Sequence, residues 1–590
     1  MSGGEGIQFS IYKIDYQEVK KQHTVTLKET EPTYAVDMCC FLLEEIKKKI
    51  SQKENPDIWN VEHESFRGII YRTYHHPAWE EMAKDLLMEC LKDENQVDSL
   101  MLNVNVSYVL FYVNNNCIYV MTGGYGSHLI KKYIEKNWGL HLMPKLVKSD
   151  AGVIRQLKEN NLFGNTSSMS KANRKTTNIT LEQDMSTIFR ELSVEVDQNI
   201  GSKMGIVYSE EVSVNRKTSV ILKDSLVLRK HLTLSELKKV IEAIERVEKE
   251  TDNFSLGYFI QAKKRGIKTS ELLDELINHF IDGKYDNFQL VGDDYLAYYT
   301  SASEYTLTTE AGEIYYSASN PIELSDIFET FKENEKKVTK SFLINFLKKW
   351  KICSQDSSGE FVLYPITIMN SIQGFIEYGA EKIPCYIFQG QWYCMDEKYK
   401  GILQSEFDCI YDGEYEKVKE IKAKFGLCKS GLTEDRYNND FYENDNIIVG
   451  HKALISNFEI ADLFFWDSEN IYLMCNKYHF DGSGSRDLTN QIRASADFLQ
   501  HQLASLQKSN FIKALYKKIE ELYVSKKKTI PIKEEDFENM FNSKRICYIA
   551  GYIEGFRKET DSLYAKYLTV DLNKKMHEKG FMCISMGIGD

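Results

Sequence analysis

The sequence predicts a multidomain α+β protein whose C-terminal part follows the order αβββαβ. Three observations support this prediction. The chain has 590 residues, which is too long for one ordinary hydrophobic core. Its apolar content of 43% is typical of globular rather than disordered proteins. Patterns typical of strands and of helices are mixed along the chain, and those in its C-terminal part follow the order αβββαβ.

We predict three domains. They are an N-terminal α+β domain over residues 1–225, a helical segment with a β-rich domain over 226–428, and the αβββαβ domain over 429–590. Short strand patterns rich in aromatic residues begin after Phe288 and distinguish the middle domain from its neighbours.

Charge, cysteine content and hydropathy limit the function and the compartment. The net charge of −13 opposes binding of nucleic acid by the whole surface but permits a local basic groove. The twelve cysteines include no CxxC pair, which favours reduced thiols over a disulfide framework or a zinc ribbon. Residues 1–5 lack the features of a signal peptide, and no apolar run approaches the roughly 20 residues that span a bilayer. We therefore expect a soluble, cytoplasmic protein without a membrane partner.

In the N-terminal domain, the clearest pattern is a hairpin. Two β-rich runs, 108–113 and 117–121, flank Asn114, Asn115 and Asn116, and asparagine tolerates the left-handed backbone of tight hairpin turns. The other elements expected in this part of the chain are strands at 6–15 and 225–229 and helices at 37–51, 79–91 and 129–137.

The glycine-rich stretch Thr122–His128 permits two interpretations. Backbone N–H groups at a strand-to-helix turn can bind phosphate, so the segment Gly123-Gly124-Tyr125-Gly126 is a candidate nucleotide contact. The stretch contains neither GxxxxGK[ST] nor GxGxxG. This favours a tight turn with a structural role.

Two further stretches complete this half of the chain. Asn161–Asn178 is polar and contains Lys171, Arg174 and Lys175, which favours a solvated loop, with a phosphate-backbone contact as the alternative. Thr233–Glu236 (TLSE) is a capping box that opens a helix with one apolar stripe.

The middle domain is expected to be mostly strands. We expect strands at 295–300, 313–317, 361–366, 383–388 and 391–395, and helices at 269–280 and 338–350. Gln389-Gly390 joins the last two strands as a short hairpin turn, and Pro384 should confine its strand to an edge. Cys385 and Cys394, on opposite arms of this hairpin, are expected to be buried thiols.

The C-terminal domain carries the residues with the clearest chemical meaning. An acidic helix end, Glu434–Asn438, precedes three strand patterns within 446–454, 458–466 and 471–477. Asp462 lies on the second strand and Lys477 ends the third. A loop at 481–487, a helix at 488–503, a strand at 546–552, a helix and a last strand at 581–588 follow.

This order and these residue types suggest a PD-(D/E)xK nuclease. Such enzymes hold Mg²⁺ with carboxylates on adjacent strands, and a lysine helps to activate the attacking water. Asp462 supplies the first acid and Lys477 the lysine, but Cys475 stands where the pattern has Asp or Glu, and a thiol is a poor Mg²⁺ ligand. Glu434 or Glu459 is expected to compensate. The alternative is an acid and a lysine that are merely solvated.

From about Tyr108 onward the chain resembles a family of sporadically distributed bacterial proteins of unknown function and similar length. The matching residues are Val109–Leu129, Trp138–Leu140, Glu434 with Tyr437 and Asn438, Glu459–Leu463, Lys477, Ser483–Leu488 and Tyr567–Ile588. In such relatives a His-Val pair precedes the lysine, whereas this chain has Cys475 and Asn476. Asn490 and Ala494 stand where relatives have histidine and glutamine, and Gln491 is a nearby substitute.

The resemblance implies a defence protein, encoded on mobile elements or in defence islands, with a restriction-endonuclease-like C-terminal core. It would hydrolyse DNA or RNA with Mg²⁺ or Mn²⁺, and a phage protein or a second copy of the chain is a further expected partner.

The resemblance also implies the site residues. The catalytic residues would be Asp462, Lys477 and Glu434, and the metal ligands would be Asp462, Glu434 and Glu459. The residues that contact nucleic acid would be Tyr437, Asn438, Ser483, Ser485, Arg486 and Gln491. Two alternatives remain open: a catalytically inactive binding component of defence, and a nucleotide-binding sensor that uses the segment Gly123–Gly126.

Overall fold

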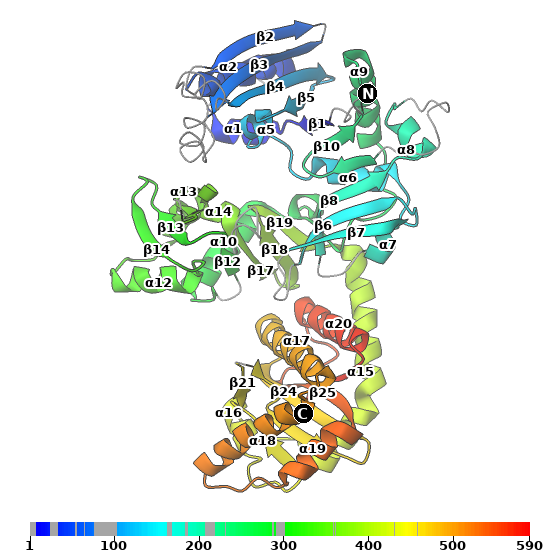
Figure 1. The fold of residues 1–590 in the computed structure, drawn as a ribbon, viewed down its shortest axis with the longest axis vertical. Coiled ribbons are helices and arrows are strands. Elements are labelled where there is room, and N and C mark those ends of the chain that lie inside the picture. Colours follow the sequence, from blue (N-terminus) through cyan, green and yellow to red (C-terminus); the bar gives the residue numbers. More distant parts are fainter. Residues whose placement is uncertain are drawn as a thin grey trace, which may run out of the picture. The chain divides into compact units, whose positions relative to one another are not determined.

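The computed structural model describes residues 8–23, 33–52, 56–63, 65–75, 103–161, 168–182, 187–206, 219–230, 232–285, 288–290, 301–357, 359, 361–429, 431–456 and 458–589. The chain divides into two compact units, Met1–Gly257 and Tyr258–Asp590 (Figure 1). Both units mix helices and strands, which confirms the predicted α+β class. Among the described residues, no helix is both long enough and apolar enough to cross a bilayer.

The first unit is built on one antiparallel sheet of ten strands, in the order β2-β3-β4-β5-β1-β10-β9-β8-β6-β7. Its strands are β1 (Gln8–Lys13), β2 (Asp57–His63), β3 (Phe66–His75), β4 (Asn103–Asn114), β5 (Cys117–Gly123), β6 (Ile154–Asn161), β7 (Ser168–Thr177), β8 (Thr187–Glu195), β9 (Ser219–Leu222) and β10 (Leu226–Arg229). Its helices are α1 (Tyr16–Gln22), α2 (Tyr34–Ser51), α5 (Gly126–Ile130), α6 (Trp138–Leu146), α7 (Ile179–Glu182), α8 (Gln198–Lys203) and α9 (Leu234–Glu248).

The predicted asparagine hairpin is confirmed. β4 and β5 pair up to Asn114 and Cys117, and Asn115 and Asn116 between them have φ of 44° and 62°. Two successive left-handed residues give the type I′ turn, whose twist matches that of the flanking strands.

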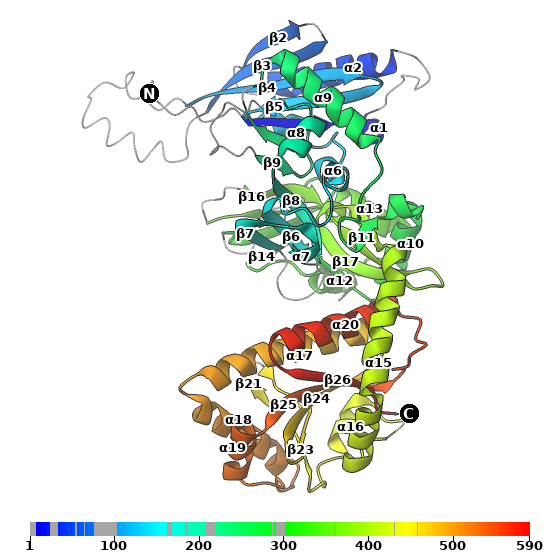
Figure 2. The same ribbon diagram turned by 90° about the vertical axis from the view of Figure 1, so that its right-hand side faces the viewer.

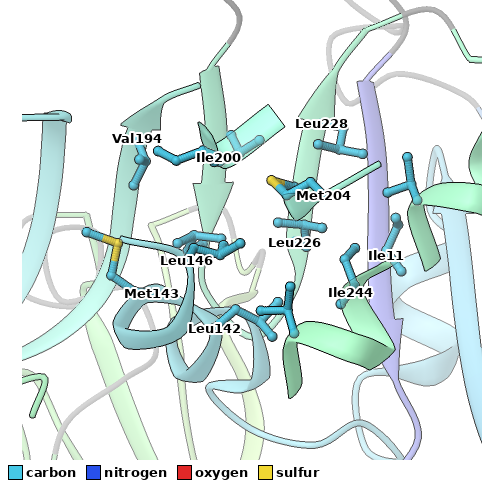
Figure 3. Close-up of a cluster of buried hydrophobic side chains, with 14 of the residues drawn as sticks. Ile11, Leu142, Met143, Leu146, Val194, Ile200, Met204, Leu226, Leu228 and Ile244 are labelled. Carbon is cyan, nitrogen blue, oxygen red and sulfur yellow. The ribbon is translucent and has the colours of Figure 1, made fainter. Parts of the chain in front are cut away.

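The sheet has a hydrophobic core on each face because side chains alternate along β4 and β5. Val109 and Phe111 belong to the core that α2 covers, whereas Tyr112 belongs to the core on the other face. Figure 3 shows the second core, in which side chains of α6, α8 and α9 meet those of β1, β8 and β10.

Two predictions for the first unit were wrong. The helix expected at 129–137 is only the short α5, because Ile134 forms a bridge with Ile14 and Asn137 is left-handed, with φ of 57°, just before α6. Much of the stretch expected as a loop at 161–178 is the strand β7. This strand lies at the edge of the sheet, where exposed polar side chains are tolerated. The helix expected at 79–91 lies outside the described residues.

Helix α9 belongs to the first unit, although the predicted domain boundary at 225/226 placed it in the middle domain. Its capping box of Thr233 and Glu236 is confirmed. Acidic side chains of α9 bind the first sheet: Tyr112 donates a hydrogen bond to Glu242, and Tyr119 donates one to Glu248. The boundary between the two compact units therefore lies at 257/258.

The second unit begins with two antiparallel sheets, β11-β19-β18-β17-β12 and β14-β13-β15-β16. Their elements are β11 (Phe259–Gln261), α10 (Thr269–Ile281), β12 (Phe288–Leu290), β13 (Glu304–Thr308), β14 (Ile314–Ala318), α12 (Leu324–Glu333), α13 (Lys340–Lys349), β15 (Lys351–Gln355), β16 (Phe361–Thr367), α14 (Ile368–Ser371), β17 (Ile372–Tyr378), β18 (Ile383–Phe388) and β19 (Gln391–Met395). The predicted strand at 295–300 lies outside the described residues.

The hairpin of β18 and β19 confirms the Gln389-Gly390 turn and corrects two other expectations. The φ angles of Gln389 and Gly390 are 48° and 72°. β18 is the central strand of its sheet rather than an edge. Pro384 is tolerated because it pairs only with Glu377 of β17, and pairing with β19 starts one residue later. Cys385 and Cys394 are direct cross-strand partners and form a disulfide instead of remaining thiols.

The last sheet has the order β20-β23-β24-β25-β26, and its first three strands are antiparallel while the rest are parallel. Its elements are α15 (Glu397–Phe425), α16 (Glu434–Asn439), β20 (Ile447–Val449), β21 (Leu454–Ile455), β22 (Phe458–Glu459), β23 (Leu463–Trp466), β24 (Asn470–His479), α17 (Gly482–Ala504), α18 (Lys508–Ser525), α19 (Glu534–Ser543), β25 (Arg545–Glu554), α20 (Leu563–Glu578) and β26 (Met582–Gly587).

The predicted αβββαβ order is therefore present as α16, β20, β23, β24, α17 and β25. The small hairpin β21–β22 is inserted after β20, and α18 and α19 precede β25. Helices α17 and α20 lie side by side along this sheet (Figure 2).

Helix α17 starts at Gly482, six residues before the predicted position. Asp481 is its N-cap, and the carboxylate accepts a hydrogen bond from the backbone N–H of Gly484. The glycines are needed for close packing rather than for a flexible loop. A Cβ at Gly484 would lie 2.3 Å from the carbonyl oxygen of His479, and one at Gly482 would lie 2.9 Å from the ring of Tyr564.

Candidate metal centre

The site lies at the end of the C-terminal sheet where β20 ends and β23 begins. These strands are antiparallel, with Val449 opposite Leu463, so the residues that follow β20 meet the residues that precede β23. The backbone N–H of Gly450 donates to the carbonyl oxygen of Asp462 at 2.8 Å. His451, one residue further, is thereby placed beside the Asp462 side chain.

Three side chains converge here. His451, Glu459 and Asp462 each offer one atom that could bind a metal, and these three atoms lie within 4.8 Å of one another. His451 Nδ1 is 2.5 Å from Asp462 Oδ1 and 3.3 Å from Glu459 Oε1. Glu459 is brought to the site by the hairpin β21–β22, and its carboxylate accepts a hydrogen bond from the backbone N–H of Lys452 at 2.6 Å.

Two asparagines hold the Asp462 carboxylate. Asp462 is 1% exposed, and it accepts hydrogen bonds from Asn438 Nδ2 at 3.2 Å and from the backbone N–H of Asn476 at 2.8 Å. Asn476 Nδ2 in turn donates to Asn438 Oδ1 at 2.7 Å. The carboxylate is therefore fixed from α16 on one side and from β24 on the other.

The charged groups of this cluster shift one another's pKa values. Burial alone would lower the pKa of His451, but hydrogen bonds with Asp462, Glu459 and Asp435 outweigh it and raise this pKa to about 10. Burial raises the pKa of Asp462. Burial opposes ionisation of Glu459 as well, but hydrogen bonds from His451 and Lys452 outweigh it and lower its pKa. His451 is thus a cation among carboxylates.

Asp435 closes the cluster on its outer side. Its Oδ1 lies 2.8 Å from His451 Nε2 and 2.9 Å from Lys452 Nζ. These two hydrogen bonds lower the pKa of Asp435 to about 2. The imidazole of His451 consequently lies between one buried and one exposed aspartate.

Lys477 and Glu434 form an adjacent pair outside this group of three. Lys477 Nζ donates to Glu434 Oε1 at 2.8 Å, and both side chains are 27% exposed. Burial would lower the pKa of Lys477, but the bond with Glu434 outweighs it, so the pKa is raised and the ammonium stays charged. The structure therefore brings Asp462 and Glu459 together as expected, while Glu434 binds Lys477 rather than joining them.

Cys475 does not contribute a ligand atom to the group of three. It is fully buried, and its Sγ lies 3.9 Å from the carbonyl oxygen of Ile460. Burial raises its pKa well above the ordinary value for a thiol. A buried neutral thiol is a poor ligand for a hard cation.

The residues expected to contact nucleic acid differ in exposure. Tyr437, Asn438 and Ser485 are fully buried, and Tyr437 donates its hydroxyl to the carbonyl oxygen of Leu427. These three side chains offer no surface to a nucleic acid. Ser483 is exposed, while Arg486 and Gln491 are half-buried on α17, and Arg486 pairs with Asp487 at 3.0 Å.

The glycine-rich turn of the first unit is explained by packing. A Cβ at Gly123 would lie 2.2 Å from the ring of Tyr108, and one at Gly126 would lie 2.2 Å from the Tyr108 carbonyl oxygen. Gly124 has φ of 57°. Each glycine is thus required by close approach to β4 or by the backbone conformation, which favours the structural interpretation of this stretch.

Sequence reasoning missed His451 and Asp435. His451 falls inside the run 446–454, which we interpreted as one apolar strand, but β20 ends at Val449 and the histidine lies in the following turn. A usable signal was present: in an antiparallel pair, a polar residue just after one strand lies near a polar residue just before the next.

The donor set fits a divalent cation. Two carboxylates and one neutral imidazole can bind a first-row divalent metal, so a metal would have to replace the proton that His451 otherwise carries on the coordinating nitrogen. Mn²⁺ accepts both oxygen and nitrogen ligands, whereas Mg²⁺ is bound mainly by oxygen. The histidine therefore shifts the expected preference from Mg²⁺ towards Mn²⁺. Asn438, Asn476 and Asp435 would act as the outer hydrogen-bond partners that orient such ligands.

Comparison with known proteins gives a family but no function. The chain belongs to the family described as "Family of unknown function (DUF6119)", which matches residues 9–559. No curated protein matches the chain. The expected resemblance to a family of unknown function is confirmed at this level.

Proposed function

We propose that this member of the family is a divalent-metal-dependent nuclease, and that its C-terminal αβββαβ domain hydrolyses phosphodiester bonds of DNA or RNA in bacterial defence. One observation carries the proposal. The αβββαβ order brings Asp462, Glu459 and His451 together within 4.8 Å and leaves the charged Lys477 on the next strand. Such a combination of hard ligands and a nearby lysine is typical of metal-assisted phosphodiester hydrolysis.

The chain's own residues have distinct roles in this proposal. His451, Glu459 and Asp462 would hold Mn²⁺ or Mg²⁺, which when bound supplies a Lewis acid and lowers the pKa of a water molecule. Lys477 stays protonated, so it would donate to a phosphate oxygen and stabilise the developing negative charge rather than remove a proton. Glu434 would keep the lysine charged and pointed towards the substrate.

The test combines metal binding with cleavage. Calorimetric titration with Mn²⁺ and with Mg²⁺ is followed by cleavage assays on plasmid DNA, single-stranded DNA and RNA. Asp462→Asn and His451→Ala should abolish Mn²⁺ binding. Lys477→Met should keep it and slow cleavage by about 100-fold or more. Asp445→Asn, an exposed carboxylate of the same domain, is the matched control and should behave like the wild type.

Two results would overturn the proposal. One is a wild type that binds neither metal. The other is cleavage that continues equally in all variants, which would point to a contaminating enzyme.

A specific observation favours a second candidate, a catalytically inactive nucleic-acid or phage-protein binding component. The carboxylates of this site already have positively charged partners without a metal, since His451 pairs with Asp462 and Asp435, and Lys477 pairs with Glu434. Buried Cys475 replaces the acid that nucleases of this pattern carry. This candidate predicts retention of DNA or RNA in a binding assay without cleavage, and the same affinity with and without Mn²⁺.

A further inference from the structure

Two lysines of the first unit lie over the ring of one buried tyrosine. Lys49 Nζ is 4.8 Å from the ring centroid of Tyr133, and Lys132 Nζ is 5.0 Å from it. Lys49 Nζ also donates a hydrogen bond to the Tyr133 hydroxyl at 3.1 Å. Among the described residues, neither lysine forms an ion pair with a carboxylate. Within this part of the chain, no direct carboxylate contact therefore balances the two positive charges.

The backbone fixes both lysines at helix ends. Lys49 lies in the last turn of α2, and Lys132 follows α5, which contacts α2. The N–H of Tyr133 donates to the carbonyl oxygen of Ile130, and the carbonyl oxygen of Tyr133 accepts from the N–H of Asp15, both at 2.8 Å. Tyr133 is fully buried, so it is a rigid base beneath the two ammonium groups.

His23 and Glu45 complete the surroundings of the tyrosine. His23, the C-cap of α1, places its Nε2 2.8 Å from the Tyr133 hydroxyl and its Nδ1 3.6 Å from Glu45 Oε2. Burial and the nearby lysines lower the pKa of His23, although the charge of Glu45 opposes this. The neutral Nε2 accepts the Tyr133 O–H, so the phenol oxygen accepts from Lys49. Glu45 also binds Lys48 at 2.7 Å, so one carboxylate faces several basic groups.

The two ammonium groups repel each other. Burial lowers the pKa of Lys49, and the charge and direct contact of Lys132 lower it further, to about 8, although Glu45 opposes this. The partial negative charge at the C-terminus of α2 stabilises lysines in its last turn, but Lys132 comes from another helix. The pair is thus a local excess of positive charge in a chain whose net charge is −13.

A doubly charged anion would balance this excess. A phosphate monoester carries about 1.5–2 negative charges at pH 7 and has three acceptor oxygens, and lysine binds phosphate as a point charge. Lys132 is exposed and Lys49 is half-buried. A phosphate group can therefore reach both ammonium groups from the solvent side, and it needs no enclosed cavity.

We propose that Lys49 and Lys132 form a binding site for a doubly charged phosphate group, and that Tyr133 and His23 position Lys49 for it. The ligand is either inorganic phosphate or a phosphate monoester such as a nucleoside monophosphate. This site is distinct from the glycine-rich turn Gly123–Gly126, and it does not depend on the proposed nuclease activity.

Calorimetric titration of the metal-free full chain with inorganic phosphate and with adenosine monophosphate at pH 8 tests the site. Lys49→Met and Lys132→Met should each weaken phosphate binding about tenfold or more, because each removes one charge-assisted contact. Methionine keeps an unbranched side chain over the Tyr133 ring. Lys47→Met is the matched control, because Lys47 lies on α2 and pairs with Glu44 at 2.6 Å. This variant should bind like the wild type.

Proton uptake gives a second readout. Lys49 is partly deprotonated at pH 8, so binding of an anion should draw up to about half a proton from the buffer. Titrations in two buffers of different ionisation enthalpy measure this uptake, which should be absent in Lys49→Met and present in Lys47→Met. Thermal unfolding without phosphate tests for a structural role. Lys132→Met relieves repulsion, so its Tm should equal or exceed that of the wild type.

The proposal fails if the wild type does not bind phosphate, or if Lys132→Met binds it as tightly as Lys47→Met does. It also fails if dimethyl phosphate, which has a single negative charge, binds as tightly as inorganic phosphate. A lower Tm of Lys132→Met would assign this lysine to stability instead. Tighter binding of adenosine monophosphate than of inorganic phosphate would identify a nucleotide as the source of the ligand, and equal affinities would identify the phosphate group alone.

Discussion

Asn438 illustrates how a fully buried amide can position a charged group. It donates to Asp462 Oδ1 and accepts from Asn476 Nδ2. Its loss removes one of the hydrogen bonds to this buried carboxylate and leaves the buried side-chain N–H of Asn476 without this partner. A buried polar group left unsatisfied costs about 1–3 kcal/mol. We expect Asn438→Ala to lower the free energy of unfolding by about 2–4 kcal/mol, as measured by urea denaturation.

Asn446→Ala is the matched control for this change. Asn446 is exposed in the same domain, and its replacement should change the stability by less than about 0.5 kcal/mol. Equal effects of the two substitutions would show that the hydrogen bonds of Asn438 do not hold the site together.

Glu414 on α15 should make the stability depend on pH. Burial raises its pKa to about 7, although the N–H of Ser585 and the charge of Lys417 oppose this. Between pH 4.5, the ordinary pKa of glutamate, and pH 7, the unfolded chain releases the Glu414 proton while the folded chain keeps it. The folded state therefore loses stability as the pH rises through this range. Glu414→Gln removes this loss.

We therefore expect Glu414→Gln to be more stable than the wild type by about 1–3 kcal/mol at pH 8, and by much less at pH 5. Urea denaturation at the two pH values measures the difference. Glu416→Gln, exposed on the same helix, should show no such change with pH. A gain for Glu414→Gln that is the same at both pH values would contradict the role of burial.

At the scale of single residues, sequence reasoning found the groups that lie on a strand or directly beside one, and missed those whose position depends on a turn. Asp462, Glu459 and Lys477 were placed by strand patterns, and the structure puts the first two within the candidate metal centre. His451 was missed because its position depends on where β20 ends. The Lys477–Glu434 pair was also not foreseen, since it depends on how α16 packs against β24.

At the scale of elements, replacing glycine by alanine should change the stability in opposite directions at two helical positions, Gly484 and Gly401. Gly484→Ala would place a Cβ 2.3 Å from the carbonyl oxygen of His479, so the backbone at the start of α17 has to shift. Gly401→Ala, within α15, meets nothing within 4 Å. Alanine is favoured over glycine inside a helix by about 1 kcal/mol.

We expect Gly484→Ala to lower the unfolding free energy by about 2 kcal/mol or more, and Gly401→Ala to raise it by about 0.5–1 kcal/mol. Chemical denaturation of the two variants beside the wild type measures both effects. If Gly484→Ala is neutral, the stretch before residue 488 behaves as the flexible loop that the sequence suggested.

Elements with local signals were predictable, and those defined by distant contacts were not. The hairpin turns at Asn115-Asn116 and Gln389-Gly390 follow from residues that tolerate a left-handed backbone. Helix α17 was predicted to start too late because Gly482 and Ser483 resemble a loop, although Asp481 caps a helix there. Helix α15 was not predicted, because only a few of its side chains are buried and its apolar residues form no strong stripe.

At the scale of the whole molecule, the chain has two units with separate hydrophobic cores. Two cores lie on the faces of the ten-stranded sheet, and the next core starts at Ala262 and is built only from residues of the second unit. The sequence placed the first boundary at 225/226 because the helical pattern of α9 resembles the start of a new domain. Its attachment to the first sheet rests on contacts such as Tyr119 with Glu248, which are far apart in sequence.

Because each unit contains its own cores, each should fold alone when the chain is divided between Gly257 and Tyr258. We expect residues 258–590 to unfold cooperatively, at the temperature of one of the transitions of the full chain in differential scanning calorimetry. Division at 225/226 provides the contrast, because it removes both β10 and α9 from the first unit. Strands β1 and β9 then lose the strand between them, and the core loses Leu226, Leu228, Val240 and Ile244, all of which are buried. The fragment 1–225 should therefore aggregate or melt without a cooperative transition, whereas 1–257 should not. Equal behaviour of 1–225 and 1–257 would mean that β10 and α9 are dispensable and that the first core is complete without them.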